Sequence, residues 1–425
     1  MSKRFPKCVL GSAVLSLAAS LITFDVPASA TFPGPVNGRI ACSRQFGGTT
    51  TNTALIEVVT MNPDGTNVTR LTNNSVLDFD PIWSPDGREI IFESFREGNV
   101  SELYKMNADG TNVVRLTTNG APEDRPGSYH PDGSQVVFHS TRTGNFDVFK
   151  MNADGTNQVN VTNLPAFDSL PYWWPDGTRI LFTSNRSGNF DVWTMSSFGA
   201  NPTRLTTHPL TDATGNVSPD GTRIAFHSTR DTPAGQPETF EVYVMNADGT
   251  NQIRLTNAPG DDFFPIWSPD GTKILFDSHR DGDREVYVMN ADGTNQQRIT
   301  VNPGFDGRCD WQRPCTITGS GDILGTNGDD VICGSAGADR IAGSGGNDQI
   351  LGLGGDDQLS GGPGEDNVYG GLGNDSITGS RGVDFASGGP GNDRIAADAG
   401  ERVDPGGGTD TCVIGGTPGC PPPLS

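Results

Sequence analysis

One sequence unit returns six times along this chain of 425 residues. Each copy pairs a Pro-Asp-Gly turn with a segment close to Met-Asn-Ala-Asp-Gly-Thr-Asn. The turns end 44 to 50 residues apart, at Gly87, Gly133, Gly177, Gly221 and Gly271. The second segment starts at Met61, Met106, Met151, Met245 and Met289, with a degenerate copy at Met195. Because so short a unit cannot bury both of its faces alone, the copies are expected to stack against one another.

The apolar runs inside each unit are short and rich in residues that favour strands. In the second unit they are residues 90–92, 103–104 and 113–116, and turn residues separate them. None of them shows the apolar spacing of three and four that is typical of a helix. Period and run length together predict an all-β fold, a six-bladed β-propeller over residues 36–313 whose blades are four-stranded antiparallel meanders.

The two ends of the repeat region complete one another. Residues 37–42 match the stretch after a Pro-Asp-Gly turn, and residues 306–311 match the innermost strand that the first unit lacks. We therefore expect strands from both ends to close the first blade, which removes an open sheet edge. Cys42 and Cys309 would then lie on neighbouring strands, within reach of a disulfide. The six cysteines after the first 30 residues allow 15 connectivities, and Cys309 with Cys315 is the rival pairing.

A longer form of the turn carries a family resemblance. Trp-Ser-Pro-Asp-Gly begins at Trp83 and Trp267, with altered forms at Tyr129, Trp173 and Val217. Together with the apolar strand that follows it, this motif resembles the TolB-type β-propeller family over about residues 36–313. The resemblance implies a fold more than an activity, because similar propellers serve as protein-binding scaffolds, peptidase gating domains and polysaccharide lyases. A propeller-based glycan lyase or hydrolase and a TolB-like envelope scaffold are therefore alternatives to a binding protein.

Polar residues recur in phase with the propeller unit. The aspartates stand five residues before the inner-strand aromatic position, at Asp78, Asp124, Asp168, Asp212, Asp262 and Asp306. The arginines end the second strands, at Arg96, Arg142, Arg186, Arg230 and Arg280. Because antiparallel neighbours bring both sets to one rim, we interpret them as structural pairs. His139 and His227 occupy one slot in blades that are not adjacent, so no histidine site and no catalytic or cofactor-binding residue is predicted.

A second repeat, of nine residues, runs from Gly325 to Ala396 without a slip. Its fourth position is always glycine, its sixth is always aspartate and its eighth is apolar. The eight aspartates are Asp330, Asp339, Asp348, Asp357, Asp366, Asp375, Asp384 and Asp393. The pattern resembles the haemolysin-type, or repeats-in-toxin (RTX), calcium-binding repeat family. A flexible linker would need no fixed phase, so a parallel β-roll with caps is expected over residues 314–413, followed by a tail at 414–425.

The RTX resemblance implies two nonapeptides per coil, so that aspartates 18 residues apart stack. Stacked carboxylates repel unless a hard cation that prefers oxygen lies between them, which makes Ca²⁺ the expected cofactor and the eight aspartates its ligands. We expect the metal-free segment to be largely disordered and calcium binding to provide its folding energy. The same stacking favours a disulfide between Cys315 and Cys333, which leaves Cys412 and Cys420 for a short C-terminal loop.

The remaining features concern location and partners. Residues 1–30 are typical of a secretory signal peptide with cleavage after Ala30, and no later segment is apolar enough to enter a membrane. A net charge of −22 argues against nucleic acid and anionic lipid as partners and favours cations. The leading hypothesis is a monomeric, secreted, extracellular or periplasmic calcium-binding protein. Its propeller would bind a protein or glycan through loops 45–53 and 231–239, which project from the Asp/Arg rim.

Overall fold

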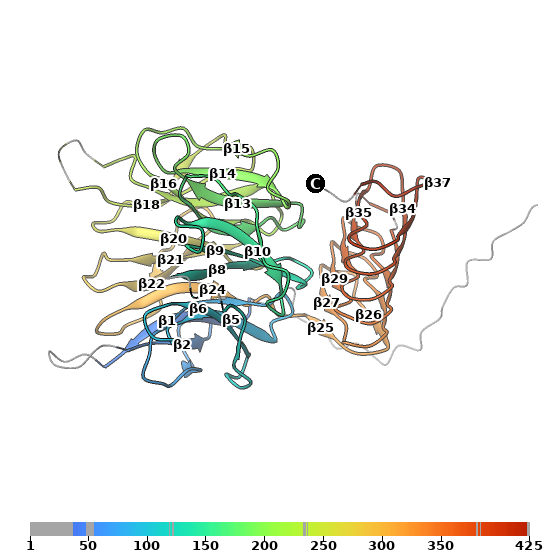
Figure 1. Cartoon of the computed structure of the whole chain (residues 1–425), viewed down its shortest axis with the longest axis horizontal. Coiled ribbons are helices and arrows are strands. Elements are labelled where there is room, and N and C mark those ends of the chain that lie inside the picture. Colours follow the sequence, from blue (N-terminus) through green and yellow to red (C-terminus); the bar gives the residue numbers. More distant parts are fainter. Residues whose placement is uncertain are drawn as a thin grey trace, which may run out of the picture. The chain divides into compact units, whose positions relative to one another are not determined.

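The computed structural model describes residues 37–47, 55–118, 120, 123–232, 235, 237–379, 381–382 and 384–422. These residues form strands and turns, and none of them belongs to a helix that could cross a membrane. The expected signal peptide and most of the loop at 45–53 lie outside the described residues. Strands β1 (Ile40–Phe46) to β24 (Asp306–Trp311) build six four-stranded antiparallel sheets, which confirms the six-bladed propeller (Figure 1).

Each blade contains an inner, a second, a third and a short fourth strand. The first blade is made of β24, β1, β2 (Leu55–Met61) and β3 (Thr69–Arg70). The second and third blades contain β4 (Asp78–Trp83), β5 (Glu89–Ser94), β6 (Glu102–Asn107), β7 (Val114–Arg115), β8 (Asp124–Tyr129), β9 (Gln135–Ser140), β10 (Asp147–Asn152) and β11 (Val159–Asn160). The last three contain β12 (Asp168–Trp173), β13 (Arg179–Ser184), β14 (Asp191–Ser196), β15 (Thr203–Arg204), β16 (Asp212–Val217), β17 (Arg223–Ser228), β18 (Glu241–Asn246), β19 (Ile253–Arg254), β20 (Asp262–Trp267), β21 (Lys273–Ser278), β22 (Glu285–Asn290) and β23 (Gln297–Arg298).

The two sequence markers are the two tight turns of each blade. In the sixth blade the Ser268 hydroxyl donates to Asp270 at 2.6 Å and accepts the Lys273 N–H at 2.9 Å. Gly271 follows with a φ of 67°, which glycine adopts without steric cost. The other marker ends on an asparagine with φ between 52° and 55° in all six copies, at Asn67, Asn112, Asn157, Asn201, Asn251 and Asn295. Asparagine tolerates this left-handed conformation better than most residues, which explains its place in the motif.

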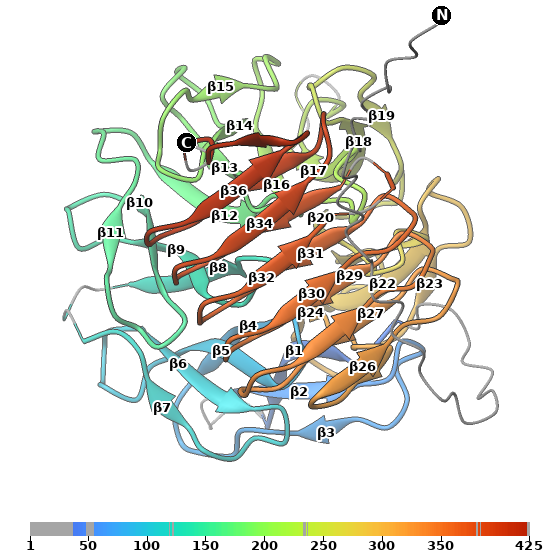
Figure 2. The same ribbon diagram turned by 90° about the vertical axis from the view of Figure 1, so that its right-hand side faces the viewer.

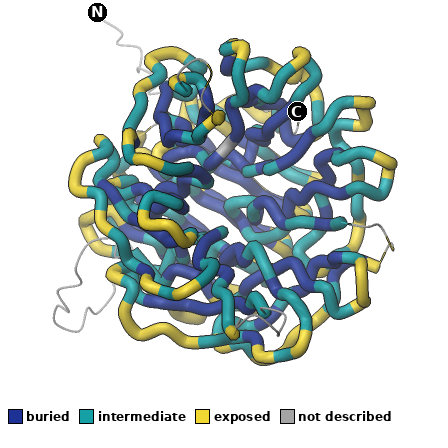
Figure 3. Tube along the Cα trace, turned by 90° about the vertical axis from the view of Figure 1, so that its left-hand side faces the viewer, coloured by how far each residue is buried: buried dark blue, intermediate teal, exposed yellow. Residues whose placement is uncertain are grey.

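Neighbouring blades pack through side chains that every unit supplies once. The second-strand phenylalanines and third-strand methionines are almost fully buried, at Phe92, Phe138, Phe182, Phe226, Phe276, Met61, Met106, Met151, Met195, Met245 and Met289. One apolar cluster joins Ile91 of the second blade to Tyr129 of the third. Buried segments gather in the body of the propeller, whereas exposed segments lie at its outer loops (Figure 3). The hydrophobic core therefore lies between the blades, as a repeat without a core of its own requires.

The ring closes where the two ends of the propeller meet. Strand β1 pairs antiparallel with β24, with Ile40 opposite Trp311 and Arg44 opposite Asp306. Cys42 and Cys309 form a disulfide across these strands, with Cα atoms 4.1 Å apart. The expected closure and its disulfide are both confirmed, and the rival pairing of Cys309 with Cys315 is wrong.

The nonapeptide repeats form a solenoid of two parallel sheets (Figure 2). One sheet contains β25 (Ile317–Thr318), β27 (Val331–Cys333), β29 (Gln349–Leu351), β31 (Asn367–Tyr369), β33 (Phe385–Ser387) and β35 (Arg402–Asp404). The other contains β26 (Asp322–Leu324), β28 (Arg340–Ala342), β30 (Gln358–Ser360), β32 (Ser376–Thr378), β34 (Arg394–Ala397), β36 (Thr411–Ile414) and β37 (Thr417–Pro418). Ile332 pairs with Ile350, 18 residues away, and the inward side chains form one continuous apolar row.

The solenoid continues beyond the last regular nonapeptide. Ile395 pairs with Cys412, a step of 17 residues, so the coil loses one residue but keeps its strand pairing. Disulfides join Cys315 to Cys333 and Cys412 to Cys420, as expected. The first links neighbouring coils, and the second ties β36 to the segment that follows β37.

The closing disulfide should contribute strongly to propeller stability. Its cysteines are 267 residues apart, and replacing both with serine should lower the free energy of unfolding by up to about 5 kcal/mol in the chain-entropy model. The matched control is the Cys412→Ser, Cys420→Ser pair. Its separation is 8 residues, and the same model gives about half that loss. Calorimetric melting of both variants checks the expectation, which fails if the long-range pair costs no more than the short one.

Candidate functional site

The eight predicted aspartates lie in two ladders along the solenoid. Each ladder has its aspartates one coil apart, and the Oδ1 atom of one residue accepts the N–H of the aspartate 18 positions earlier. Asp348 accepts from Asp330 at 2.9 Å, and Asp357 accepts from Asp339 at 2.8 Å. Later steps repeat the contact at 2.8 to 3.0 Å, through Asp366, Asp375, Asp384 and Asp393. The stacking expected from the repeat is therefore present, with every aspartate buried.

Asp410 extends one ladder beyond the predicted set. Its Oδ1 atom accepts the Asp393 N–H at 2.9 Å across the shortened coil. A sequence signal existed, since Asp410 follows three glycines and stands 17 residues after Asp393. A search for an unbroken step of nine passes over it.

The second carboxylate oxygen divides the aspartates into two groups. In the first coil a neighbouring hydroxyl takes it, because Thr326 donates to Asp330 at 2.8 Å and Ser335 donates to Asp339 at 2.9 Å. Five later aspartates have a buried Oδ2 atom without a hydrogen-bond partner among the described residues: Asp348, Asp357, Asp366, Asp375 and Asp393. A buried, unsatisfied carboxylate oxygen is costly, so these atoms are positioned for a ligand that the protein does not itself supply.

Glycines make room for these oxygens. A Cβ atom at Gly343 would collide with Asp348 Oδ2 and with the carbonyl oxygen of Gly361 on the next coil. Gly352 stands in the same relation to Asp357 and to the Gly370 carbonyl. A carboxylate oxygen and a backbone carbonyl oxygen thus approach one point, and oxygen donors of both kinds suit Ca²⁺.

The donor set fits a hard cation only if backbone oxygens take part. Within the described parts of the chain, no group of three or more His, Cys, Asp or Glu side chains is placed to hold a metal ion. Each ladder aspartate would therefore act together with turn carbonyls that glycine leaves accessible. The described residues fit that arrangement.

Burial and mutual repulsion shift the titration of the ladder. Burial, and then the charges of Asp366 and Asp330, raise the pKa of Asp348 to about 7. Burial, and then Asp375 and Asp339, do the same for Asp357. Burial also raises the pKa values of Asp366, Asp375 and Asp393 to about 6. Ionised aspartates therefore oppose the folded, metal-free coil at neutral pH.

The periodic aspartates and arginines of the propeller form the structural pairs that the sequence predicted. Arg280 donates to Asp262 at 2.7 Å, and its guanidinium carbon lies 4.6 Å from the centre of the Tyr287 ring. The same ion pair occurs in all six blades, because Arg44 supplies the partner of Asp306. A second buried series was not predicted. Third-strand carboxylates pair with fourth-strand arginines in five blades, at Glu57, Glu102, Asp191, Glu241 and Glu285 with Arg70, Arg115, Arg204, Arg254 and Arg298.

The propeller channel is where the blades differ. Four inner strands hold their third residue in a left-handed conformation, with φ between 49° and 53°, at Asp80, Leu170, Phe264 and Arg308. Such a conformation costs a non-glycine residue about 1 to 3 kcal/mol and tends to occur at functional sites. All four line one cavity of about 50 Å³, to which inner strands of all six blades contribute.

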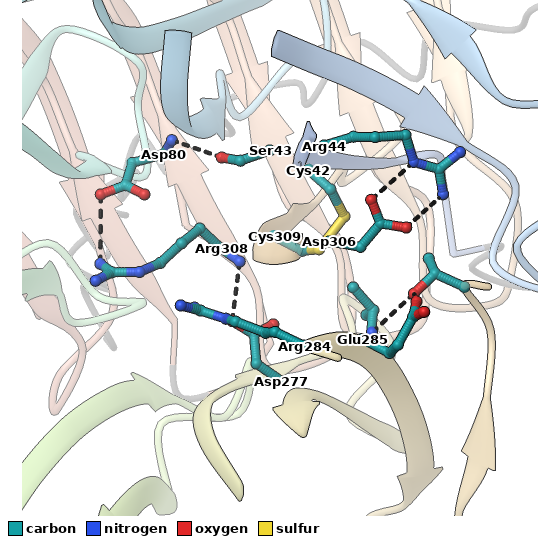
Figure 4. The surroundings of a disulfide bond; sticks show 12 residues. Cys42, Ser43, Arg44, Asp80, Asp277, Arg284, Glu285, Asp306, Arg308 and Cys309 are labelled. Carbon is teal, nitrogen blue, oxygen red and sulfur yellow. Dashed lines mark hydrogen bonds and ion pairs between the residues drawn. A yellow bond between two sulfur atoms is a disulfide. The ribbon is translucent and has the colours of Figure 1, made fainter. Parts of the chain in front are cut away.

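Charged groups from separate blades meet at this cavity (Figure 4). Arg308 pairs with Asp80 at 3.3 Å, and its backbone N–H donates to Asp277 at 3.0 Å. Asp277 is also ion-paired with Arg284. The Arg308 guanidinium carbon lies 3.9 Å from the centre of the Phe264 ring. Sequence periodicity could not find this cluster, because none of its members repeats.

The histidine slot also reaches the channel. His139 lines the cavity, and His227 packs against Phe264 with ring centres 5.1 Å apart. Burial, and then Arg125 and Arg308, hold the pKa of His139 well below its usual range. Burial, and then Arg308 and Arg284, lower that of His227 to about 3. Both imidazoles are therefore neutral at physiological pH. Their second-strand position alone did not predict that the channel cluster would approach them.

Comparison with known proteins agrees with the two architectures. Residues 126–236 and 232–318 match the sequence profile of the TolB beta propeller domain. Segments between 324 and 412 match the RTX calcium-binding nonapeptide repeat. Both resemblances drawn from the sequence are confirmed.

Solved structures resemble the propeller at low sequence identity. TolB from Acinetobacter baumannii is 23% identical with a TM-score of 0.56, covering 67% of this chain and 68% of that one. The hydrazine synthase of Kuenenia stuttgartiensis is 15% identical with a TM-score of 0.53, covering 65% of this chain and 47% of that one. No curated protein matches the chain significantly. At these identities the likeness shows the fold alone.

The ladder pKa values predict how the metal-free solenoid responds to pH. Folded-state pKa values of about 6 to 7 exceed the ordinary 3.8, so the stabilisation is complete below about pH 4 and is lost as the pH rises through 6 and 7. Hydrogen exchange of chelator-treated protein, corrected for intrinsic rates, should show more protection of residues 343–379 at pH 5 than at pH 8. Protection of β13 in the propeller serves as the internal control. Equal or greater protection at pH 8 would contradict the expectation.

Proposed function

We propose that this chain, in which a TolB-type β-propeller precedes RTX calcium-binding repeats, is a secreted calcium-binding protein whose propeller acts as a protein- or glycan-binding scaffold. The observation that carries the proposal is the pair of aspartate ladders with five unpartnered, buried carboxylate oxygens. Such oxygens, beside glycine carbonyls, offer the coordination that a hard divalent cation prefers.

In this proposal the ladder aspartates hold the calcium ions. Asp348, Asp357, Asp366, Asp375 and Asp393 would use their free Oδ2 atoms, while their Oδ1 atoms keep the backbone contacts. Asp330, Asp339 and Asp384 complete the predicted set. Bound calcium supplies positive charge, and with it the carboxylates no longer repel one another. Folding of the solenoid would therefore depend on calcium at neutral pH.

An extracellular location is consistent with this dependence. Extracellular calcium modules bind with dissociation constants of about 10⁻⁴ to 10⁻³ M, so they fill outside the cell and stay empty in a calcium-poor cytoplasm. The three disulfides favour an oxidising compartment. The signal peptide expected at residues 1–30 would provide export by the general secretory route.

Calcium should protect the solenoid selectively from hydrogen exchange. At pH 7.5, about 2 mM calcium acting on sites with dissociation constants near 10⁻⁴ M should add about 1 to 2 kcal/mol per site, whereas magnesium should add much less. Exchange of the full chain, followed by mass spectrometry of residues 343–379, measures this gain. A calcium titration with no gain in these residues would refute the proposal.

Two neighbouring substitutions separate a metal ligand from general acidity. Asp366→Asn keeps an oxygen that can accept the Asp348 N–H but removes the charge, so the calcium midpoint should rise several-fold. Glu365→Gln removes one charge from an exposed neighbour and should leave the midpoint nearly unchanged. Equal shifts in the two variants would mean that calcium responds to overall charge, not to the ladder.

A further inference from the structure

The propeller channel contains an arginine whose hydrogen-bonding capacity is mostly unused. Among the described residues, the Arg308 side chain makes one hydrogen bond, the 3.3 Å contact to Asp80, and 23% of it is exposed. A guanidinium has five N–H donors in a planar fork, so several remain for a ligand. Its contact with Phe264 holds the group at the cavity.

A buried histidine offers a second polar contact in the same cavity. His139 is 4% exposed, and its Nδ1 atom has no hydrogen-bond partner among the described residues. A neutral imidazole has one N–H donor and one acceptor nitrogen. Buried polar atoms are almost always paired with protein or water, so this nitrogen is expected to meet a bound group.

The walls of the cavity limit the size of that group. Ile82, Leu170, Tyr172 and Ile266 line it together with Phe264, and its volume is about 50 Å³. A single water needs about 10 to 15 Å³ by the same measure, so the cavity admits a group of a few heavy atoms. A sugar ring or an aromatic acid is too wide to enter. A carboxylate with a short aliphatic stem has the right size and polarity.

We propose that the channel binds the carboxylate group of a slender ligand, with Arg308 as the principal partner and His139 as the second. The inference rests on the proposed binding role of the propeller, and it adds the site and the chemical class of the ligand. Planar guanidinium donors match a carboxylate in two parallel hydrogen bonds, which are stronger than neutral ones.

The acidic groups nearby are already neutralised. Asp80 is held by Arg308, and Asp277 by Arg284. Glu93 is also close to this region, and burial, followed by the charge of Asp80, raises its pKa above the usual range. The channel therefore presents no uncompensated negative charge to an entering carboxylate at neutral pH. The short aliphatic stem would lie against the apolar walls.

Calorimetric titration of the full chain with three small probes tests the inference. Propionate should bind, whereas propionamide, which has the same shape without the charge, should bind about tenfold or more weakly. Benzoate tests the size limit and should bind no better than propionamide. Equal affinity for propionate and propionamide, or no propionate binding up to about 100 mM, overturns the proposal.

Variants then assign the site. Arg308→Gln should weaken propionate binding by about tenfold to a hundredfold, because charged hydrogen bonds are lost. His139→Phe keeps a ring in the slot and should weaken binding by a smaller factor, which provides a second readout if Arg308→Gln does not fold. Arg88→Gln, whose side chain is 49% exposed on a Pro-Asp-Gly turn, is the matched control and should bind as the native chain does. Native affinity in both channel variants overturns the assignment.

A peptide pair distinguishes the two sources of a carboxylate. Trialanine with a free C-terminus should bind more tightly than propionate if the natural ligand is a chain end, and about equally if it is a free acid. Trialanine amide should not bind in either case, and its binding contradicts the proposal. Calcium protection is measured in the same samples, so failure of the solenoid prediction and failure of the channel prediction are told apart.

Discussion

The pairing of β1 with β24 is the contact on which the whole propeller depends. Every blade buries its phenylalanine and methionine side chains against the next blade, so an open ring would expose two apolar faces and two sheet edges. Closure must join residues as distant as Arg44 and Asp306, which are 262 positions apart. The loop entropy of that single contact is large, and the Cys42–Cys309 disulfide removes much of it from the unfolded chain. The most expensive contact in the ring therefore carries the covalent link.

Ring closure also creates the channel, and there the blades stop being equivalent. Repeated polar residues satisfy one another within a blade, as Asp262 and Arg280 do, so they are unavailable for recognition. The third residue of the inner strand differs in each blade, and the backbone bulge turns it toward the axis. A rigid, repetitive scaffold thus holds Asp80, Phe264 and Arg308 in strained conformations around one small cavity. Strain of this kind persists only where the surrounding structure imposes it.

The solenoid obeys a different balance of forces. Its apolar row favours the coil, while its aspartate ladders oppose it once their carboxyl groups ionise. The propeller has no such conflict, because its buried carboxylates have arginine partners. One chain thus joins a domain whose stability is internal to a domain whose stability depends on pH and, under the proposed function, on calcium. Glycine is essential to the second, since side chains at Gly343 or Gly352 would fill the space around the carboxylates.

The sequence by itself determined the features that repeat. Periods of 44 to 50 and of nine residues specify blades and coils, because each copy must pack on the next in the same way. It also placed Cys42 beside Cys309, since the closing strand has the same motif as the others. Only the tertiary structure decided what the unrepeated residues do. Asp80 and Arg308 are 228 positions apart and meet through ring closure and a backbone bulge, neither of which leaves a local pattern. Asp410 likewise joins its ladder through strand pairing, after the nine-residue period has ended.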